Sequence, residues 1–185
     1  MSHINPFIEQ DIRRWGYFFL LGHKSHVLFC NWVKHHKEDI NSVLEVGCGY
    51  FDYYSWFFQA LDMSYTGLDI NEKIIDSRKE MNPEQDFVCE DFLTHASTKK
   101  YDLVFHHMVL SGTLSVEDNF KVISATINSS NKYGFGSFWN VDNIVVEDLK
   151  SFLLEEVGTK ASVFTVPTKL SEEQVQHQLI MLWQK

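Results

Sequence analysis

The sequence has no long apolar run. The apolar segment at residues 15–21 contains Gly16 and is followed by Gly22 and His23, whereas a membrane-spanning helix needs ~20 consecutive apolar residues. The first residues also lack the basic stretch leading into an apolar one that marks a secretory signal. We therefore expect a protein that has no membrane span and works in the cytoplasm.

Cysteine and proline are scarce, with three of each among 185 residues. The cysteines Cys30, Cys48 and Cys89 are widely spaced and odd in number, which indicates reduced thiols rather than a disulfide framework or a zinc ribbon. Hydrophobic residues make up 44% of the chain, as is typical of a packed globular protein. The length predicts one domain over residues 1–185, because a second complete domain has no room.

Basic side chains are outnumbered. Lys and Arg total 16 and Asp and Glu total 25, so the formal net charge at pH 7 is -9. Nucleic-acid binding draws most of its affinity from basic groups that contact phosphates. Basic pairs such as Arg13-Arg14 and Lys99-Lys100 are too short to follow a phosphate backbone. We expect no nucleic-acid partner.

Short apolar runs alternate with longer amphipathic ones, which is typical of βαβ units and a mostly parallel sheet. The predicted strands cover residues 42–46, 65–70, 87–89, 101–106, 134–139, 161–166 and 177–183. No helix length separates the last two strands, so we expect an antiparallel hairpin at the edge of the sheet. The predicted fold class is α/β: a doubly wound, mostly parallel seven-stranded sheet with helices on both faces and an antiparallel C-terminal strand.

Three residues mark predicted helix ends. Asn71 and Ser115 are predicted N-caps, and Ser115 with Asp118 has the spacing of a capping box. Gly158 is predicted to end a helix over residues 145–157.

The most informative feature follows the first predicted strand. Gly47 and Gly49 let the backbone turn tightly and approach a ligand where a Cβ would intrude. An acidic residue, Asp69, ends the next strand at a spacing typical of ribose recognition. Each residue also has a plainer explanation: the glycines could serve only a turn, Asp69 could cap a helix, and Asp91 could be a solvated loop carboxylate. Their occurrence at successive strand ends favours a ligand, because open α/β sheets bind ligands there.

The segment 43–49, Val-Leu-Glu-Val-Gly-Cys-Gly, resembles the first signature of the class I S-adenosylmethionine-dependent methyltransferases. Asp69 resembles the second signature, the carboxylate that binds both ribose hydroxyls, and Glu90-Asp91-Phe92 resembles the third, beside the adenine. Residues 101–104 are similar to the fourth, which leads into the residues that face the methyl group. The resemblance covers residues 42–114 in detail. It implies S-adenosyl-L-methionine as cofactor, bound by Glu45, Gly47, Cys48, Gly49, Asp69, Ile70, Asp91, Phe92 and His106.

Two neighbouring positions bear on the choice of cofactor. The family commonly has a third glycine where this chain has Phe51. Asp52 takes the place of the last glycine in the dinucleotide pattern, where a carboxylate would repel a diphosphate but not a cationic sulfonium. Asp52, with Glu45 and Asp69, therefore favours S-adenosylmethionine over NAD or FAD.

His106 and His107 end the fourth predicted strand, where the resemblance places the acceptor. Both are candidate catalytic residues, although methyl transfer from a sulfonium needs a general base only when the nucleophile carries a proton to remove. Their alternative role is packing and hydrogen bonding. We predict no metal site, although His107 with Asp142-Asn143 resembles the metal-binding set of catechol-type O-methyltransferases, in which the first ligand is an aspartate.

These observations predict a methyltransferase with an N-terminal helical cap over residues 1–40 and a Rossmann-like core over residues 41–185. The acidic charge favours a small-molecule acceptor, with a protein side chain as the second substrate class. Two other functions remain open: a non-catalytic cofactor-binding protein or partner subunit of the same fold, which Phe51 supports, and a nicotinamide-dependent oxidoreductase. The sequence leaves the acceptor atom and the oligomeric state open.

Overall fold

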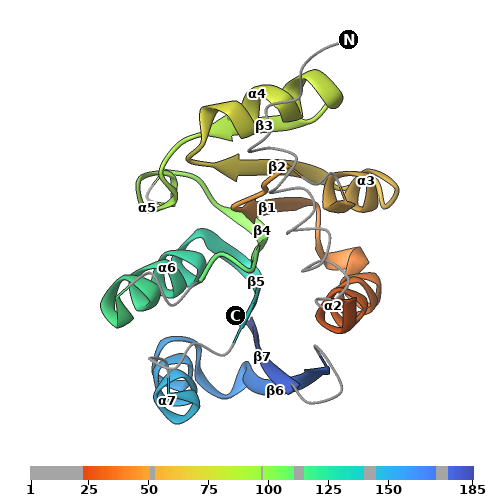
Figure 1. Ribbon diagram of the computed structural model, residues 1–185. Helices are drawn as coiled ribbons and strands as arrows, with labels where there is room; N and C mark the ends of the chain where they lie inside the picture. The colour runs from red at the N-terminus through yellow and green to blue at the C-terminus, as the bar shows by residue number, and fades with distance from the viewer. Residues whose placement is uncertain (1–22, 51–52, 97, 111–114, 140–144, 170–174) are drawn as a thin grey trace.

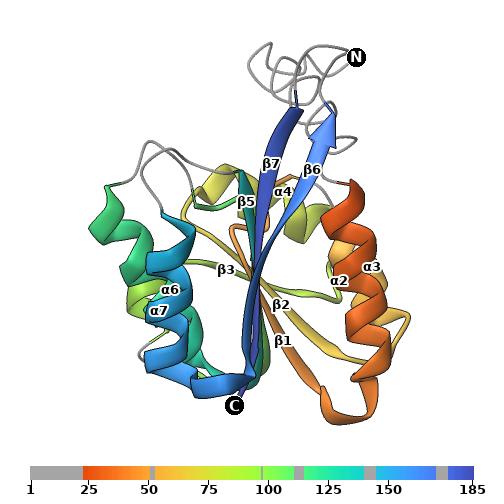
Figure 2. The same cartoon turned by 90° about the horizontal axis from the view of Figure 1, so that it is seen from below.

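The computed structural model describes residues 23–50, 53–96, 98–110, 115–139, 145–169 and 175–185. Helices flank both faces of one seven-stranded sheet (Figures 1 and 2). The strands are β1 (Ser42–Val46), β2 (Ser64–Asp69), β3 (Asp86–Cys89), β4 (Tyr101–His107), β5 (Ser130–Trp139), β6 (Ala161–Lys169) and β7 (Val175–Gln184). The helices are α2 (His23–His35), α3 (Tyr53–Gln59), α4 (Glu72–Met81), α5 (Phe92–His95), α6 (Val116–Ser129) and α7 (Val146–Val157). Two 3₁₀ turns, Lys37–Asp39 and Gly158–Lys160, complete the described elements.

The strand order is β3-β2-β1-β4-β5-β7-β6. The pairs among β1 to β5 are parallel, and β7 is antiparallel to both β5 and β6. The predicted fold class is confirmed. The predicted C-terminal hairpin lies at one edge of the sheet, with β6 outermost and β7 inserted between β5 and β6.

Alternating residues of each strand face different helices. In β4, Leu103 and Phe105 belong to the core cluster that packs against α2, α3 and α4, whereas Val104 belongs to a cluster with Phe92 of α5. This period of two is the geometry of a β-strand. Figure 2 shows α2 and α3 on one side of the sheet and α6 and α7 on the other. Consecutive residues at the end of β4 are therefore expected to point to opposite faces.

The described part of the N-terminal cap packs directly on the sheet. The fully buried Phe29 of α2 has its ring centroid 4.7 Å from that of Phe105 and 4.5 Å from that of Phe135. Residues 1–22 lie outside the described residues, so the division at residue 40 stays a prediction. In the part that is described, no helix combines the length and the hydropathy that crossing a membrane requires.

The predicted helix ends are confirmed. The Asn71 side chain accepts a hydrogen bond from the Lys73 N–H at 3.1 Å, and the Ser115 side chain accepts one from the Asp118 N–H at 3.0 Å. Gly158 ends α7 with a φ of 71°, which glycine adopts at little cost. The one-turn helix α5, which follows the N-cap Asp91, was not predicted from the sequence.

Candidate active site

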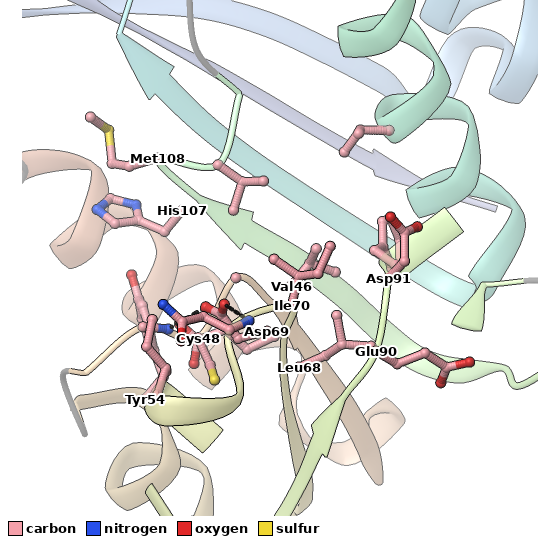
Figure 3. A pocket seen from close by; sticks show the side chains of 18 of the residues that line it. Val46, Cys48, Tyr54, Leu68, Asp69, Ile70, Glu90, Asp91, His107 and Met108 are labelled. Carbon is pink, nitrogen blue, oxygen red and sulfur yellow. Dashed lines mark hydrogen bonds between the residues drawn. The ribbon is translucent and has the colours of Figure 1, made fainter. Parts of the chain in front are cut away.

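A cavity of about 790 Å³ opens at the carboxyl ends of β1 to β4. The strand order reverses between β1 and β4, and open α/β sheets bind ligands at such a reversal. In the view of Figure 3, Asp91 lies at one end of the cavity, Tyr54 and His107 lie at the other, and Asp69 lies between them. The predicted residues from three successive strand ends therefore line one site.

The turn after β1 closes over the end of β2. Gly47 and Gly49 have φ values of 69° and 56°, in the left-handed region that favours glycine. The N–H groups of Gly47 and Cys48 both donate to the Leu68 carbonyl, at 2.7 and 3.0 Å. A Cβ at Gly47 would come within 2.5 Å of Cγ2 of Val109, whereas one at Gly49 would meet nothing within 4 Å. Gly47 is therefore required by packing, and Gly49 leaves open space in the cavity lining.

Asp69, at the end of β2, is hydrogen-bonded to this turn. Its Oδ2 accepts a hydrogen bond from the Gly49 N–H at 3.2 Å, and its Oδ1 accepts one from the Asn71 N–H at 2.9 Å. An ionised carboxylate has about four acceptor sites, so both oxygens keep the capacity to bind a ligand hydroxyl. Ile70, the next residue, lines the cavity with 71% of its surface exposed. Asp69 thus makes two structural hydrogen bonds and keeps acceptor capacity for a ligand.

Glu45 lines the cavity from β1, although only 5% of the residue is exposed. Its Oε2 accepts a hydrogen bond from the Tyr65 hydroxyl at 2.5 Å. Burial, followed by the charge of Glu45, raises the pKa of Tyr65 well above its ordinary value, so this hydroxyl stays protonated and keeps donating.

Glu90, Asp91 and Phe92 line the far end of the cavity. Asp91 caps α5 by accepting a hydrogen bond from the Leu93 N–H at 2.8 Å. Glu90 is held by His95, with 2.8 Å between Oε2 and Nδ1. Phe92 is mostly buried and presents an apolar surface. The structure therefore places these three residues in the lining of the same cavity as Asp69.

The charged groups of the cavity are all acidic among its described lining residues. No lysine or arginine is among them, and the carboxylates are Glu45, Asp69, Glu90, Asp91 and Asp118. The site therefore favours a cation and disfavours a diphosphate. The predicted Asp52 and Phe51 lie outside the described residues. Cys48 also lines the cavity, and burial raises the pKa of its thiol far above the ordinary value, so this thiol stays protonated.

The two predicted histidines point to opposite faces of the sheet. His107 lines the cavity, and its Nδ1 is hydrogen-bonded to Ser137 Oγ. Burial, then the nearby His26 and His106, lowers its pKa to about 3. His106 is fully buried and does not line the cavity; its ring lies over Gly136, where a Cβ would come 2.5 Å from Cε1. The structure thus brings His107 to the cavity and leaves His106 outside its lining.

His106 has an unusual environment for a polar ring. Neither of its ring nitrogens has a hydrogen-bond partner among the described residues. Burial lowers its pKa to about 3, so the ring is neutral. Strand alternation explains why two adjacent histidines differ in this way.

Sequence reasoning missed several residues of the site. His26 of α2 and Tyr54 of α3 both line the cavity, and the Tyr54 hydroxyl lies 2.5 Å from His26 Nδ1. Tyr54 was visible only as an apolar helix position, and Ser137 gave no signal. Among the described residues, no three His, Cys, Asp or Glu side chains gather as a metal site would require. Asp142 and Asn143 lie outside the described residues.

Comparison with known proteins agrees with this geometry. A family model described as a methyltransferase domain matches residues 44–127. Magnesium protoporphyrin IX methyltransferase from Synechocystis PCC 6803, with bound SAM, superposes with a TM-score of 0.69 at 18% identity, covering 99% of this chain and 86% of that one. A search of curated proteins gives no match.

Two further solved structures have the same fold. A TehB-like SAM-dependent methyltransferase from Corynebacterium glutamicum gives a TM-score of 0.65 at 14% identity, covering 98% of this chain and all of that one. The plantazolicin methyltransferase BpumL gives 0.68 at 14% identity, covering 96% and 88%. Residues 44–127 therefore carry a methyltransferase domain, and the chain has the seven-strand fold of the class I S-adenosylmethionine-dependent methyltransferases.

Proposed function

We propose that this protein binds S-adenosyl-L-methionine and transfers its methyl group to a small-molecule acceptor. One observation carries the proposal: a single cavity joins the turn at Gly47 and Gly49 to the carboxylate of Asp69, and its described charged residues are all acidic. Two solved structures of the magnesium protoporphyrin IX methyltransferase, one with SAM and one with SAH, add support from the fold.

The residues present fit this cofactor. The open space at Gly49 leaves room for the methionine portion, and Asp69 has acceptor capacity for the ribose hydroxyls. Ile70 and Phe92 supply apolar surface for the adenine, and Asp91 lies at the same end of the cavity. Glu45 and Cys48 complete the side nearest the glycine turn. When bound, the cofactor supplies a methyl group on a positively charged sulfur, which an acidic lining stabilises.

The acceptor class follows from size and charge. About 790 Å³ lies within the range of small-molecule pockets. The net charge of -9 disfavours a polyanionic substrate. The structures with the same fold include enzymes for magnesium protoporphyrin IX and for plantazolicin, both of them acceptors other than nucleic acids. His107 is the predicted catalytic candidate that lies in this cavity.

The experiment is a thermal melt with S-adenosylmethionine, S-adenosylhomocysteine or NAD. A ligand at a hundred times its Kd stabilises a protein by about 2.7 kcal/mol, which for a domain of this size raises Tm by roughly 5–10 °C. We expect that rise with the first two ligands and none with NAD. Stabilisation by NAD alone would contradict the proposal.

Asp69→Asn tests the carboxylate. The substitution keeps one side-chain oxygen but removes the charge and an acceptor, so it should remove most of the shift, because hydrogen bonds to charged groups contribute about 1.5–3 kcal/mol. Asp76→Asn is the matched control, because Asp76 is an exposed carboxylate on α4 that does not line the cavity. Equal shifts in the two variants would place the ribose elsewhere.

A further inference from the structure

Four side chains from four separate elements meet where β4 ends. The Tyr54 hydroxyl of α3 lies 2.5 Å from Nδ1 of His26 on α2. The His26 and His107 ring centroids are 5.7 Å apart, and His107 Nδ1 is hydrogen-bonded to Oγ of Ser137 on β5. We refer to these four residues as the β4-end cluster. Three of them line the cavity, whereas Ser137 is fully buried and does not.

Ser137 holds His107 in two ways. Its Oγ contacts Nδ1 of the ring, and its carbonyl oxygen accepts a hydrogen bond of 2.7 Å from the N–H of Met108, the residue that follows. Met108 has a φ of 62°, an uncommon value for a side chain other than glycine, so the chain turns sharply just after His107. With Nδ1 occupied, Nε2 is the ring nitrogen left to contact a ligand.

Two titratable members of the cluster, His107 and Tyr54, are uncharged at physiological pH. Burial and the neighbouring histidines lower the pKa of His107 to about 3, so its ring is neutral and one nitrogen carries hydrogen. When Nδ1–H donates to Ser137, Nε2 presents a lone pair. Burial, then the charge of Glu45, raises the pKa of Tyr54 well above its ordinary value, so its hydroxyl stays protonated and is hydrogen-bonded to Nδ1 of His26.

Rings surround this end of the cavity. The Tyr53 and His26 centroids lie 3.9 Å apart, and those of Tyr54 and His107 lie 6.1 Å apart. Aromatic side chains pack well against other rings in tilted or edge-on arrangements. An anionic acceptor is disfavoured, because the charged groups in the described lining are carboxylates. The chemistry therefore fits a neutral aromatic molecule.

We propose that the β4-end cluster binds an aromatic acceptor with an un-ionised hydroxyl, that Nε2 of His107 takes the hydroxyl proton, and that Ser137 is a positioning residue. This inference rests on the proposed function. The hydroxyl oxygen forms a bond to the methyl carbon as the carbon–sulfur bond breaks, and the sulfur keeps that electron pair as a neutral thioether. The proton passes to Nε2 and then to solvent.

The low basicity of His107 selects the type of nucleophile. An oxygen that is being methylated becomes a far stronger acid than any imidazolium, so the proton moves to Nε2 even at a pKa near 3. An ammonium group is a much weaker acid and would keep its proton. Amines that are protonated at neutral pH are therefore not expected acceptors.

The test is binding of three probes to protein saturated with S-adenosylhomocysteine, measured by NMR titration. The probes are 2-naphthol, naphthalene without the hydroxyl, and 2-naphthylmethylammonium. We expect 2-naphthol to bind at least tenfold more tightly than naphthalene, whereas the ammonium probe, which the acidic lining attracts, should bind without being methylated. We also expect S-adenosylmethionine to convert it to 2-methoxynaphthalene. Equal affinity for naphthol and naphthalene, methylation of the ammonium probe, or no methoxynaphthalene would overturn the inference.

Substitutions test whether the preference for 2-naphthol arises from the β4-end cluster. His107→Phe should abolish the naphthol preference, and Ser137→Ala should reduce it three- to tenfold, both with an unchanged thermal shift by S-adenosylhomocysteine. Ser129→Ala is the matched control, because Ser129 is a fully buried serine whose hydroxyl bonds to the Ala125 carbonyl outside the cavity. If His107→Phe does not fold, His107→Leu replaces it, with the same expectation.

A spectroscopic readout separates positioning from general support. Ring ¹⁵N shifts should show hydrogen on Nδ1 of His107 in the wild type and on Nε2 in Ser137→Ala, since the bond to one nitrogen sets the tautomer. An Nε2–H ring in the wild type, or no change in the variant, would contradict the role of Ser137. If S-adenosylhomocysteine itself fails to bind, the proposed function fails; if it binds and naphthol is not preferred, only the present inference fails.

Discussion

The two ends of the cavity are lined by different kinds of chemical group. The end formed by β1, β2 and β3 uses a backbone turn at Gly47 and Gly49 together with carboxylates that follow consecutive strands. The end formed around β4 uses side-chain rings from α2, α3 and β4, with His107 held by Ser137 of β5. We call these the carboxylate end and the ring end.

The two ends of the cavity differ in which amino-acid substitutions they tolerate. Backbone that adopts a left-handed conformation next to a packed side chain leaves no choice of residue, as Gly47 beside Val109 shows. Rings that meet through side-chain contacts can be exchanged without moving the backbone. In the proposed function, the carboxylate end holds the cofactor and the ring end holds the acceptor.

Gly47→Ala should break the carboxylate end and have the largest effect. The left-handed backbone costs about 1–2 kcal/mol for alanine, and the new Cβ would meet Cγ2 of Val109 at 2.5 Å, where overpacking costs about 1–3 kcal/mol. We expect a lower free energy of unfolding in urea and a loss of the thermal shift by S-adenosylhomocysteine.

Two control variants separate the cost of the left-handed backbone from the cost of the contact with Val109. Gly49→Ala has a similar φ but no neighbour within 4 Å, so its stability loss should be limited to about 1–2 kcal/mol. Gly47→Ala combined with Val109→Ala should recover the overpacking part. If Gly47→Ala and Gly49→Ala destabilise the protein equally, the contact with Val109 is not a source of strain.

Lowering the pH should destabilise the folded protein through the histidines of β4. This loss of stability is the next largest effect that we expect. The pKa of His106 is depressed to about 3 in the folded protein, from an ordinary value near 6.5. Between these values the unfolded chain binds a proton that the folded protein does not, so this histidine makes stability fall as the pH falls. The slope is about 1.4 kcal/mol per pH unit, or about 2.5 kcal/mol between pH 6 and pH 4.

His106→Gln isolates this contribution. Glutamine does not titrate, so the variant should lose less stability than the wild type between pH 6 and pH 4, whatever its stability at pH 7. Urea unfolding at each pH gives both slopes. Parallel slopes would mean that the ring is protonated equally in the folded and unfolded states, which its complete burial argues against.

The same contrast explains what the sequence could predict. Gly47, Gly49 and Asp69 lie within one short stretch of chain, where strand and turn geometry fixes their relation, so their meeting could be foreseen. His107 and Ser137 are joined by the β4–β5 pairing, and His26 and Tyr54 by the packing of α2 against α3, which no local pattern records. The pair His106 and His107 could have been divided in advance, because adjacent strand residues face opposite sides.

Asp91→Ser should have the smallest effect on stability of the substitutions at the carboxylate end. Serine can still accept the Leu93 N–H that Asp91 binds at 2.8 Å, so α5 keeps its N-cap and stability should change by only a few tenths of a kcal/mol. The charge at the far end of the cavity is lost, so affinity for S-adenosylhomocysteine should fall severalfold in calorimetric titration. Asp91→Ala loses both functions and should cost about 1 kcal/mol of stability besides. Unchanged affinity in both variants would leave Asp91 as a helix cap alone and would confine the ligand contacts of the carboxylate end to β1 and β2.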